Sequence, residues 1–204
     1  MSPPGGPEGE PVGTRGIEIV PQKWVERYAP LPQGWWAQNA PGMARRVPEL
    51  PGRLDVLCQA HGVDPRLLLV RMQAEQAALT YAWDESARDY AGGDADKLRY
   101  LCGADRTDGG DRPGGWFGWQ RQLQAVVARF RYWYRGESQA ELPNWLGLRA
   151  DPTYAAGVPV RVDGVTVTPA NQVSADCLRY TPHLAAVELV RGIGRRYFGE
   201  DYAT

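Results

Sequence analysis

Residues 64–80 read DPRLLLVRMQAEQAALT, and the expected architecture follows from this stretch. Asp64 and Pro65 are typical of a helix start, because an aspartate side chain caps the first free N–H groups and proline already has the φ angle of the first helical position. Residues 66–79 contain no Gly or Pro, so we expect one helix to continue through them. Residues 67–72 are apolar on nearly every side, which is typical of a helix buried at the centre of a domain.

Glu75 is the carboxylic acid of this helix. An ionised carboxylate is costly to bury without a partner, and burial therefore favours the protonated form. A carboxylic acid that keeps its proton near neutral pH is what general acid catalysis requires. The helix alone leaves an alternative open, in which Glu75 pairs with Arg71 one turn earlier or faces solvent.

The helical pattern continues along the chain. Apolar spacing predicts further helices from about residue 50 to 61 and over 119–135, 171–180 and 184–198, and a short one at 94–101. The alternating stretches VPVRV and VTVTP are joined by Asp163-Gly164, which predicts a β-hairpin with a type I′ turn. The predicted fold class is mainly α (α+β), with about five helices and a small β-hairpin.

The chain is expected to have three regions. Residues 1–16 are rich in Pro and Gly and predict a disordered tail. Residues 17–49 combine apolar residues with frequent prolines and predict an irregular extension that packs on the body. Residues 50–204 form the main domain, in which the Asp- and Gly-rich residues 84–115 read as a long loop of the functional or disordered kind.

Composition narrows the possible functions. The formal net charge is -1, whereas a dedicated binder of nucleic acid or of anionic membranes carries a basic surplus. Cys58, Cys102 and Cys177 have no metal-type spacing, and we expect small buried thiols. His61 and His183 lie in no HExxH-like pattern, so we expect neither a metal nor a cofactor.

Three segments carry the candidate chemistry. They are QAEQ at 73–76, GWFGWQ at 115–120, and NQ at 171–172 followed by RYTP at 179–182. A glycosidase cleft needs an acid, amides that bind acetamido and hydroxyl groups, and aromatic faces that pack on sugar rings. The candidate substrate-binding residues are the amides and aromatic residues of these segments together with one threonine: Gln73, Gln76, Trp116, Phe117, Trp119, Gln120, Asn171 and Thr181.

Tryptophans fit two roles. Trp83, Trp116 and Trp119 lie at predicted loop–helix junctions, where they stack on sugar rings or plug the core. Trp133 lies on the apolar face of its predicted helix and is expected in the core.

The acid helix, the glycine–aromatic–glutamine segment and the Asn…Tyr helix occur in the order seen in lytic transglycosylases and goose-type lysozymes. More closely, residues 67–80, 114–133 and 171–184 resemble an actinobacterial and phage group of lysozyme-like glucosaminidase or hydrolase domains. The resemblance covers roughly residues 50–198. The chain departs from that group in two ways: it has Cys102 where many relatives have a cysteine pair, and residues 1–49 have no counterpart.

The resemblance implies a lysozyme-like fold and an enzyme that cleaves the β-1,4 glycosidic bond between amino sugars. The substrate would be peptidoglycan or a chitin-like glycan, and the activity that of a muramidase, a lytic transglycosylase or an N-acetylglucosaminidase. It implies Glu75 as the catalytic acid and Gln120 in the cleft. Tyr180 would be a second catalytic residue beside Glu75, where it orients the acid or steadies the transition state.

A second carboxylate is the open mechanistic question. Most glycosidases use a pair of acids, and the loop after Glu75 offers several, although loop aspartates are mostly turn formers or solvated charges. The resemblance to lytic transglycosylases implies instead that the acetamido or 6-hydroxyl group of the substrate acts as nucleophile. The loop candidates are Asp84, Glu85, Asp89, Asp94, Asp96, Asp105, Asp108 and Asp111.

The N-terminus, MSPPGGPEGEPVGTRG, has neither the basic start nor the apolar core of a secretory signal, and no stretch predicts a membrane span. A wall hydrolase of this kind reaches its substrate as a phage endolysin or as a virion component; otherwise we expect a cytoplasmic protein. We expect a monomer without nucleic-acid partners or membrane insertion. The alternative function is a non-catalytic glycan-binding or phage virion structural module on the same fold.

Overall fold

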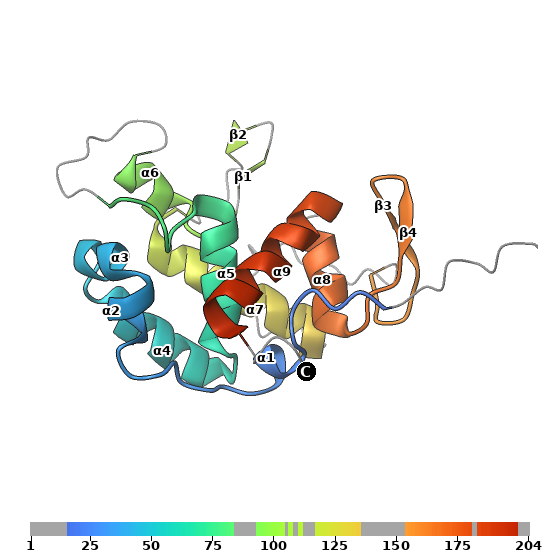
Figure 1. Ribbon diagram of the computed structural model, residues 1–204, viewed down its shortest axis with the longest axis horizontal. Helices are drawn as coiled ribbons and strands as arrows, with labels where there is room; N and C mark the ends of the chain where they lie inside the picture. Colours follow the sequence, from blue (N-terminus) through green and yellow to red (C-terminus); the bar gives the residue numbers. More distant parts are fainter. Residues whose placement is uncertain are drawn as a thin grey trace, which may run out of the picture.

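The computed structural model describes residues 16–83, 93–104, 106–107, 110–111, 117–135, 154–180 and 183–199. Within these residues the protein is mainly helical and carries two small antiparallel hairpins (Figure 1). The predicted mainly α class is therefore confirmed. The predicted N-terminal tail lies outside the described residues except for Gly16.

The helices are α1 (Lys23–Glu26), α2 (Trp35–Asn39), α3 (Pro41–Arg46), α4 (Leu50–His61), α5 (Pro65–Gln76), α6 (Asp94–Arg99), α7 (Trp119–Arg135), α8 (Gln172–Tyr180) and α9 (Leu184–Phe198). The strands are β1 (Arg106–Thr107), β2 (Gly110–Asp111), β3 (Val160–Val162) and β4 (Val165–Val167). The first two strands pair with each other, as do the last two. The described part of the chain thus holds more helices than apolar spacing predicted. The additional ones, α1, α2 and α3, are too short to give a clear apolar pattern.

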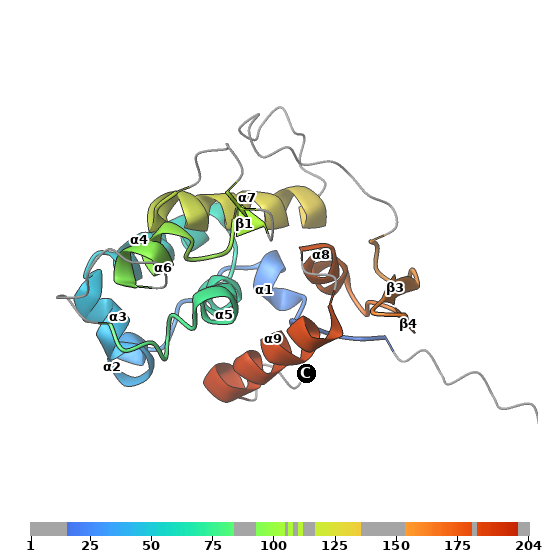
Figure 2. The ribbon, with the colours of Figure 1, turned by 90° about the horizontal axis from the view of Figure 1, so that it is seen from above.

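Helix α5 lies at the centre of the fold. It contacts α1, α4, α7 and α9, and Figure 2 shows it between α7 and α9. Every residue from Pro65 to Met72 is buried. Asp64 accepts a hydrogen bond from the backbone N–H of Arg66 at 2.9 Å, which is the predicted cap. The prediction of a buried central helix that starts at Asp64-Pro65 is confirmed.

The end of α5 differs from the prediction. The helix stops at Gln76 because Ala77 takes a left-handed conformation with φ of 53°. The side chain of Gln73 then stabilises the turn that follows: its Oε1 accepts from the Leu79 N–H at 2.7 Å, and its Nε2 donates to Thr80 Oγ1 at 3.0 Å. The expectation of a helix through residue 79 is wrong, because these bonds replace those of another helical turn.

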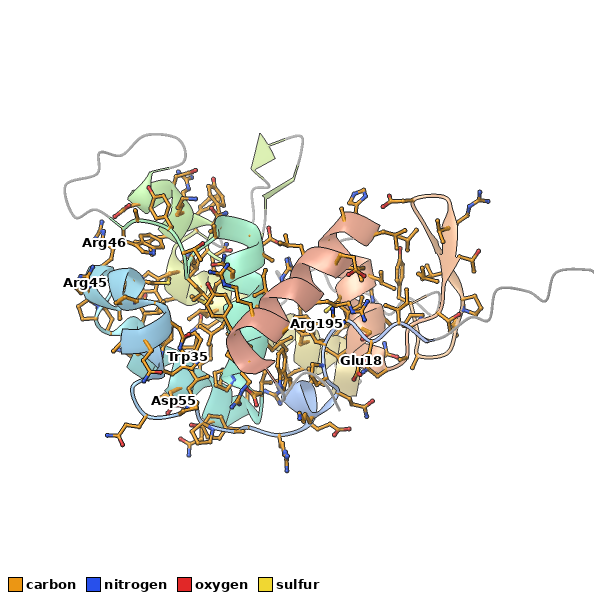
Figure 3. The ribbon with its side chains drawn as sticks, in the orientation of Figure 1. Glu18, Trp35, Arg45, Arg46, Asp55 and Arg195 are labelled. Atoms are coloured by element: carbon orange, nitrogen blue, oxygen red, sulfur yellow. The ribbon has the colours of Figure 1, made fainter. Side chains whose placement is uncertain are left out.

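Residues 17–49, predicted as an irregular extension that packs on the body, do pack into the common core, and they contain three short helices that were not predicted. Prolines limit the length of these helices without preventing them, and Pro41 itself occupies the start of α3. Trp24 and Trp35 belong to the same core as the rest of the described protein. Trp35, labelled in Figure 3, stacks on Phe198 of α9 with ring centroids 5.6 Å apart and planes 13° from parallel.

The segment before α1 binds to residues near the other end of the chain. Ile17 forms a parallel bridge with Pro169. The backbone N–H of Ile19 donates to Ser174 Oγ of α8 at 2.8 Å, and both residues are buried. The N-terminal segment is therefore part of the domain packing in this structure.

Other predicted elements agree closely with the structure. Helix α4 ends at His61 and is followed by Gly62, whose φ of 62° is left-handed, and α7 and α9 have the predicted bounds. The β3–β4 hairpin turns at Asp163 and Gly164, with the two positive φ angles, 48° and 81°, that a type I′ turn requires.

All three cysteines are buried free thiols, as expected. In the described residues, no helix has the length and hydropathy to cross a membrane.

Asp176 of α8 is a buried carboxyl group, 1% exposed. Its Oδ1 accepts a hydrogen bond from Gln172 Nε2 at 2.9 Å, whereas Oδ2 has no hydrogen-bond partner in the described structure. Loss of hydration raises the pKa of Asp176 to about 7, although the bond from Gln172 and the charge of Arg179 act against it. The folded protein therefore holds a proton here that the unfolded chain releases near its ordinary value of 3.8.

We predict that Asp176→Asn changes how stability depends on pH. Because the pKa of Asp176 is higher in the folded state, protonation of this group stabilises the folded protein. The stabilisation is complete below about pH 4, decreases as the pH rises toward about 7, and is absent above that pH. Over this pH range the contribution of Asp176 to the free energy of unfolding falls by at most on the order of 4 kcal/mol. Urea unfolding at acidic, intermediate and mildly alkaline pH should show this fall in the wild type and not in the variant.

The control is Asp163→Asn in the exposed hairpin turn. The backbone N–H of Leu184 and the His183 side chain lower the pKa of Asp163, so this variant should lose stability at neutral pH and not in acid. A pH profile of D176N that runs parallel to the wild-type profile would contradict the assignment for Asp176.

Candidate active site

Glu75 lies in the last turn of α5, where the helix leaves the core. Its side chain is 28% exposed, whereas that of Arg71 is 4% exposed. Arg71 Nη2 donates a hydrogen bond to Glu75 Oε1, within an ion pair one turn apart. The expectation that apolar surroundings bury this acid is therefore wrong, because only residues up to Met72 lie within the core. The ion pair is the alternative that the sequence left open.

Gly103 faces Glu75 from the loop after α6. It has a left-handed φ of 70°, and a Cβ built there would lie 2.3 Å from Glu75 Oε2. A side chain at this position would have to displace the Glu75 carboxyl group, and the left-handed backbone itself favours glycine. The carboxyl group thus lies between the Arg71 guanidinium on one side and the Gly103 backbone on the other.

Gln122 holds the loop that carries Gly103. It lies on α7 and is fully buried. Its Oε1 accepts from the N–H groups of Cys102 at 3.1 Å and of Ala104 at 3.0 Å, and its Nε2 donates to the Ala104 carbonyl at 2.9 Å. This amide brackets residue 103 on both sides and fixes its distance from Glu75.

Helix α6 holds the end of α5 from another direction. Lys97 Nζ donates to the carbonyl oxygen of Gln76 at 3.1 Å, which places a positive charge at the C-terminus of α5. Gln76 Nε2 in turn donates to the Tyr100 carbonyl at 3.1 Å. The turn that presents Glu75 is thereby fixed to both α6 and the loop that follows it.

This geometry gives the two oxygens of Glu75 different surroundings. Oε1 accepts the bond from Arg71, and Oε2 lies on the side of Gly103. A carboxylic acid that donates a proton while Oε1 stays with the guanidinium must carry that proton on Oε2. The neighbouring Cys102 is no nucleophile, because complete burial raises the pKa of its thiol and keeps it protonated.

Three of the predicted substrate-binding amides are engaged by the protein itself. Gln73 and Gln76 form the bonds described above. Asn171 Oδ1 accepts from the Ser174 N–H at 2.8 Å and caps α8. Its Nδ2 donates to Glu18 Oε1 at 3.1 Å (Glu18 is labelled in Figure 3) and to the Val20 carbonyl at 3.2 Å. Their amides therefore have structural roles that residue type alone does not predict.

The predicted aromatic and amide residues of the second segment lie in two places. Phe117 packs edge-on against Tyr100 at 5.8 Å. Trp119 and Gln120 line a groove between α4 and α7 whose described lining residues do not include Glu75. The remaining candidates are outside what the structure describes: Trp116, Thr181 and the side chains of Trp133 and Tyr180.

Three of the candidate loop acids lie within the described residues: Asp94, Asp96 and Asp111. Asp94 is fully buried and pairs with Arg46 (labelled in Figure 3) at 2.9 Å, which is a structural role. Asp96 lies in the first turn of α6, and Asp111 ends β2. The other candidates are outside the described residues: Asp84, Glu85, Asp89, Asp105 and Asp108. Among the described residues no group of three His, Cys, Asp or Glu side chains could hold a metal ion.

Gln122 and Gly103 are the site residues that sequence reasoning missed. A signal for Gln122 exists: it shares the apolar face of α7 with Leu123 and Val126, where an amide must find partners inside the protein. For Gly103 the sequence has no such signal, because the close approach to Glu75 depends on the path of the whole loop.

A scan against protein-family models and searches of curated proteins and of solved structures found no match to this chain.

We predict that Gly103→Ala destabilises the protein through Glu75. The substitution meets both a left-handed backbone and the carboxyl group, so the free energy of unfolding should fall by about 2–4 kcal/mol. In a Glu75→Ala background the cost should drop to the backbone contribution, about 1–2 kcal/mol. Urea unfolding of the single and double variants measures this coupling.

Gly157→Ala is the matched control, because Gly157 has a φ of 73° and no atom lies within 4 Å of the point that its Cβ would occupy. It should lose only the backbone contribution. Equal costs for G103A and G157A, unchanged by removal of the Glu75 side chain, would refute the proposed contact.

Proposed function

We propose that the protein is a lysozyme-like glycosidase that cleaves β-1,4 bonds between the amino sugars of peptidoglycan strands, with Glu75 as its general acid. The observation that carries the proposal is the position of Glu75. It is a carboxyl group at the emerging end of the central helix, fixed between Arg71 and Gly103. Glycosidases donate a proton from such a positioned acid to the oxygen of the leaving sugar.

The arrangement of the helices around Glu75 supports the proposal. Helix α7 reaches this site through Gln122, which holds the loop of Gly103, whereas Trp119 and Gln120 line a separate groove. The Gly118 N–H also donates to the Arg99 carbonyl at 3.0 Å, which fixes the start of α7 against α6. The third segment forms α8, which packs on α7.

The proposed reaction follows from the two oxygens of Glu75. With a proton on Oε2, Glu75 protonates the glycosidic oxygen as the bond from that oxygen to the anomeric carbon breaks. We propose that the acetamido or 6-hydroxyl group of the substrate forms the new bond to that carbon. In the 6-hydroxyl case its proton returns to Glu75, and the product is an anhydro sugar. Arg71 keeps the carboxyl group in place throughout.

We predict that Glu75→Gln abolishes wall cleavage while the protein stays folded. Glutamine preserves the size of the side chain and its bond from Arg71 but cannot donate a proton as an acid. Loss of a general acid lowers rates by roughly 10²–10⁴-fold. Clearing of a peptidoglycan suspension measures the activity, and thermal unfolding checks the fold.

The matched control is Glu188→Gln on the surface of α9, because Glu188 also pairs with an arginine of its own helix, Arg191, at 2.9 Å. This variant should keep wild-type activity. Near-wild-type clearing by E75Q would remove Glu75 from the mechanism.

Product analysis separates the possible reactions. Mass spectrometry of digested peptidoglycan should show anhydro sugars if the 6-hydroxyl group is the nucleophile, and reducing ends if water completes the reaction. The new ends also show which of the two alternating glycosidic bonds is cut.

The ion pair favours one second candidate, a module that binds glycan strands without cleaving them. In this case the carboxylate of Glu75 would serve to neutralise the buried Arg71 guanidinium. Binding of chitooligosaccharides to the wild type with no turnover over days would identify such a module. E75Q would then lose stability rather than activity.

A further inference from the structure

A groove of about 500 Å³ lies between α4 and α7, which run side by side (Figure 2). This volume is within the range of sites that hold small ligands or short peptides. The described residues that line it come from α4 and α7, and none comes from α5 or the loop of Gly103. It is therefore separate from the candidate active site.

Five of the nine described residues that line the groove are apolar. Val56, Leu57 and Ala60 of α4 face Leu123 and Trp119 of α7. Val56 is 63% exposed, which leaves apolar surface open to water. A ligand with small apolar side chains would cover this surface favourably.

The polar groups of the groove are cationic or neutral. Arg53 and Arg121 contribute guanidinium groups, and Gln120 and Gln124 contribute amides. No acidic residue is among the described lining residues. Guanidinium groups bind carboxylates through charge-assisted paired hydrogen bonds, and side-chain amides match the peptide group.

We infer that this groove binds a short peptide that carries carboxylates and small aliphatic side chains. An uncharged sugar fits less well, because it offers no carboxylate to the two guanidinium groups. The inference rests on the proposed function for the source of the peptide. Peptidoglycan carries peptides of alanine and acidic residues on its glycan strands, so the groove would hold a peptide stem of the polymer being cleaved.

The test uses N-acetyl-L-alanyl-D-glutamate as the probe in an NMR titration of the full chain. Signals of Val56 and of the Trp119 indole should shift on binding. Arg53→Gln and Arg121→Gln should each weaken binding by about tenfold, the effect of losing one charge-assisted interaction. The same dipeptide with both carboxylates amidated should bind weakly to the wild type.

Arg161→Gln in β3 is the matched control. It removes the same charge at an exposed position of the hairpin, at the opposite end of the molecule from α4 (Figure 1). Its affinity for the dipeptide should equal that of the wild type, and thermal unfolding should show that all three arginine variants are folded.

The outcome separates this inference from the proposed function. Because the probe has no glycosidic bond, its binding to E75Q should match that to the wild type whether or not Glu75 is catalytic. Wall clearing without dipeptide binding in the groove would overturn the inference and leave the proposed function standing. A peptide-free chitotetraose that shifts the same signals at equal or lower concentration would overturn the assignment to a peptide.

Discussion

The burial of α5 is the constraint on which the rest of the structure depends. A helix that is apolar on nearly every side must be surrounded, and here α1, α4, α7 and α9 surround it. The surrounding helices cover it only as far as Met72, so its last turn emerges from the core. Glu75 lies in that turn, half-buried, with Arg71 still inside the protein as its partner. The candidate site is thus a consequence of where the packing around one helix stops.

Local patterns predicted the elements whose causes are local. The Asp64 cap, the stop at Gly62, the long amphipathic α7 and the turn at Asp163-Gly164 all follow from interactions between residues close in sequence. The short helices within residues 17–49 were not predicted, and two of them carry tryptophans, Trp24 and Trp35, that pack on Phe198 of α9, far away in the sequence. The end of α5 was missed because the sequence does not show that the Gln73 amide bonds to the turn that follows the helix.

In the candidate site, too, local features could be predicted and contacts between distant residues could not. Glu75 could be selected from the sequence of its helix. Its ion pair with Arg71 was one of the alternatives that the sequence left open. The glycine–aromatic segment then pointed to Gln120, although the structure uses the buried amide of Gln122 to shape the site and places Gln120 in a different groove. A polar residue on the apolar face of a helix is as informative as one next to a glycine–aromatic motif, because its partners must come from elsewhere in the chain.

The bond between Ile19 and Ser174 joins residues 155 positions apart in the chain. During synthesis the N-terminal segment therefore leaves the ribosome long before α8 exists to receive it. Trp24 and Trp35, which belong to the common core, spend that interval without their final neighbours. Such distant pairing slows folding and leaves apolar surface exposed to other chains. Completion of the domain therefore waits until α8 has been synthesised.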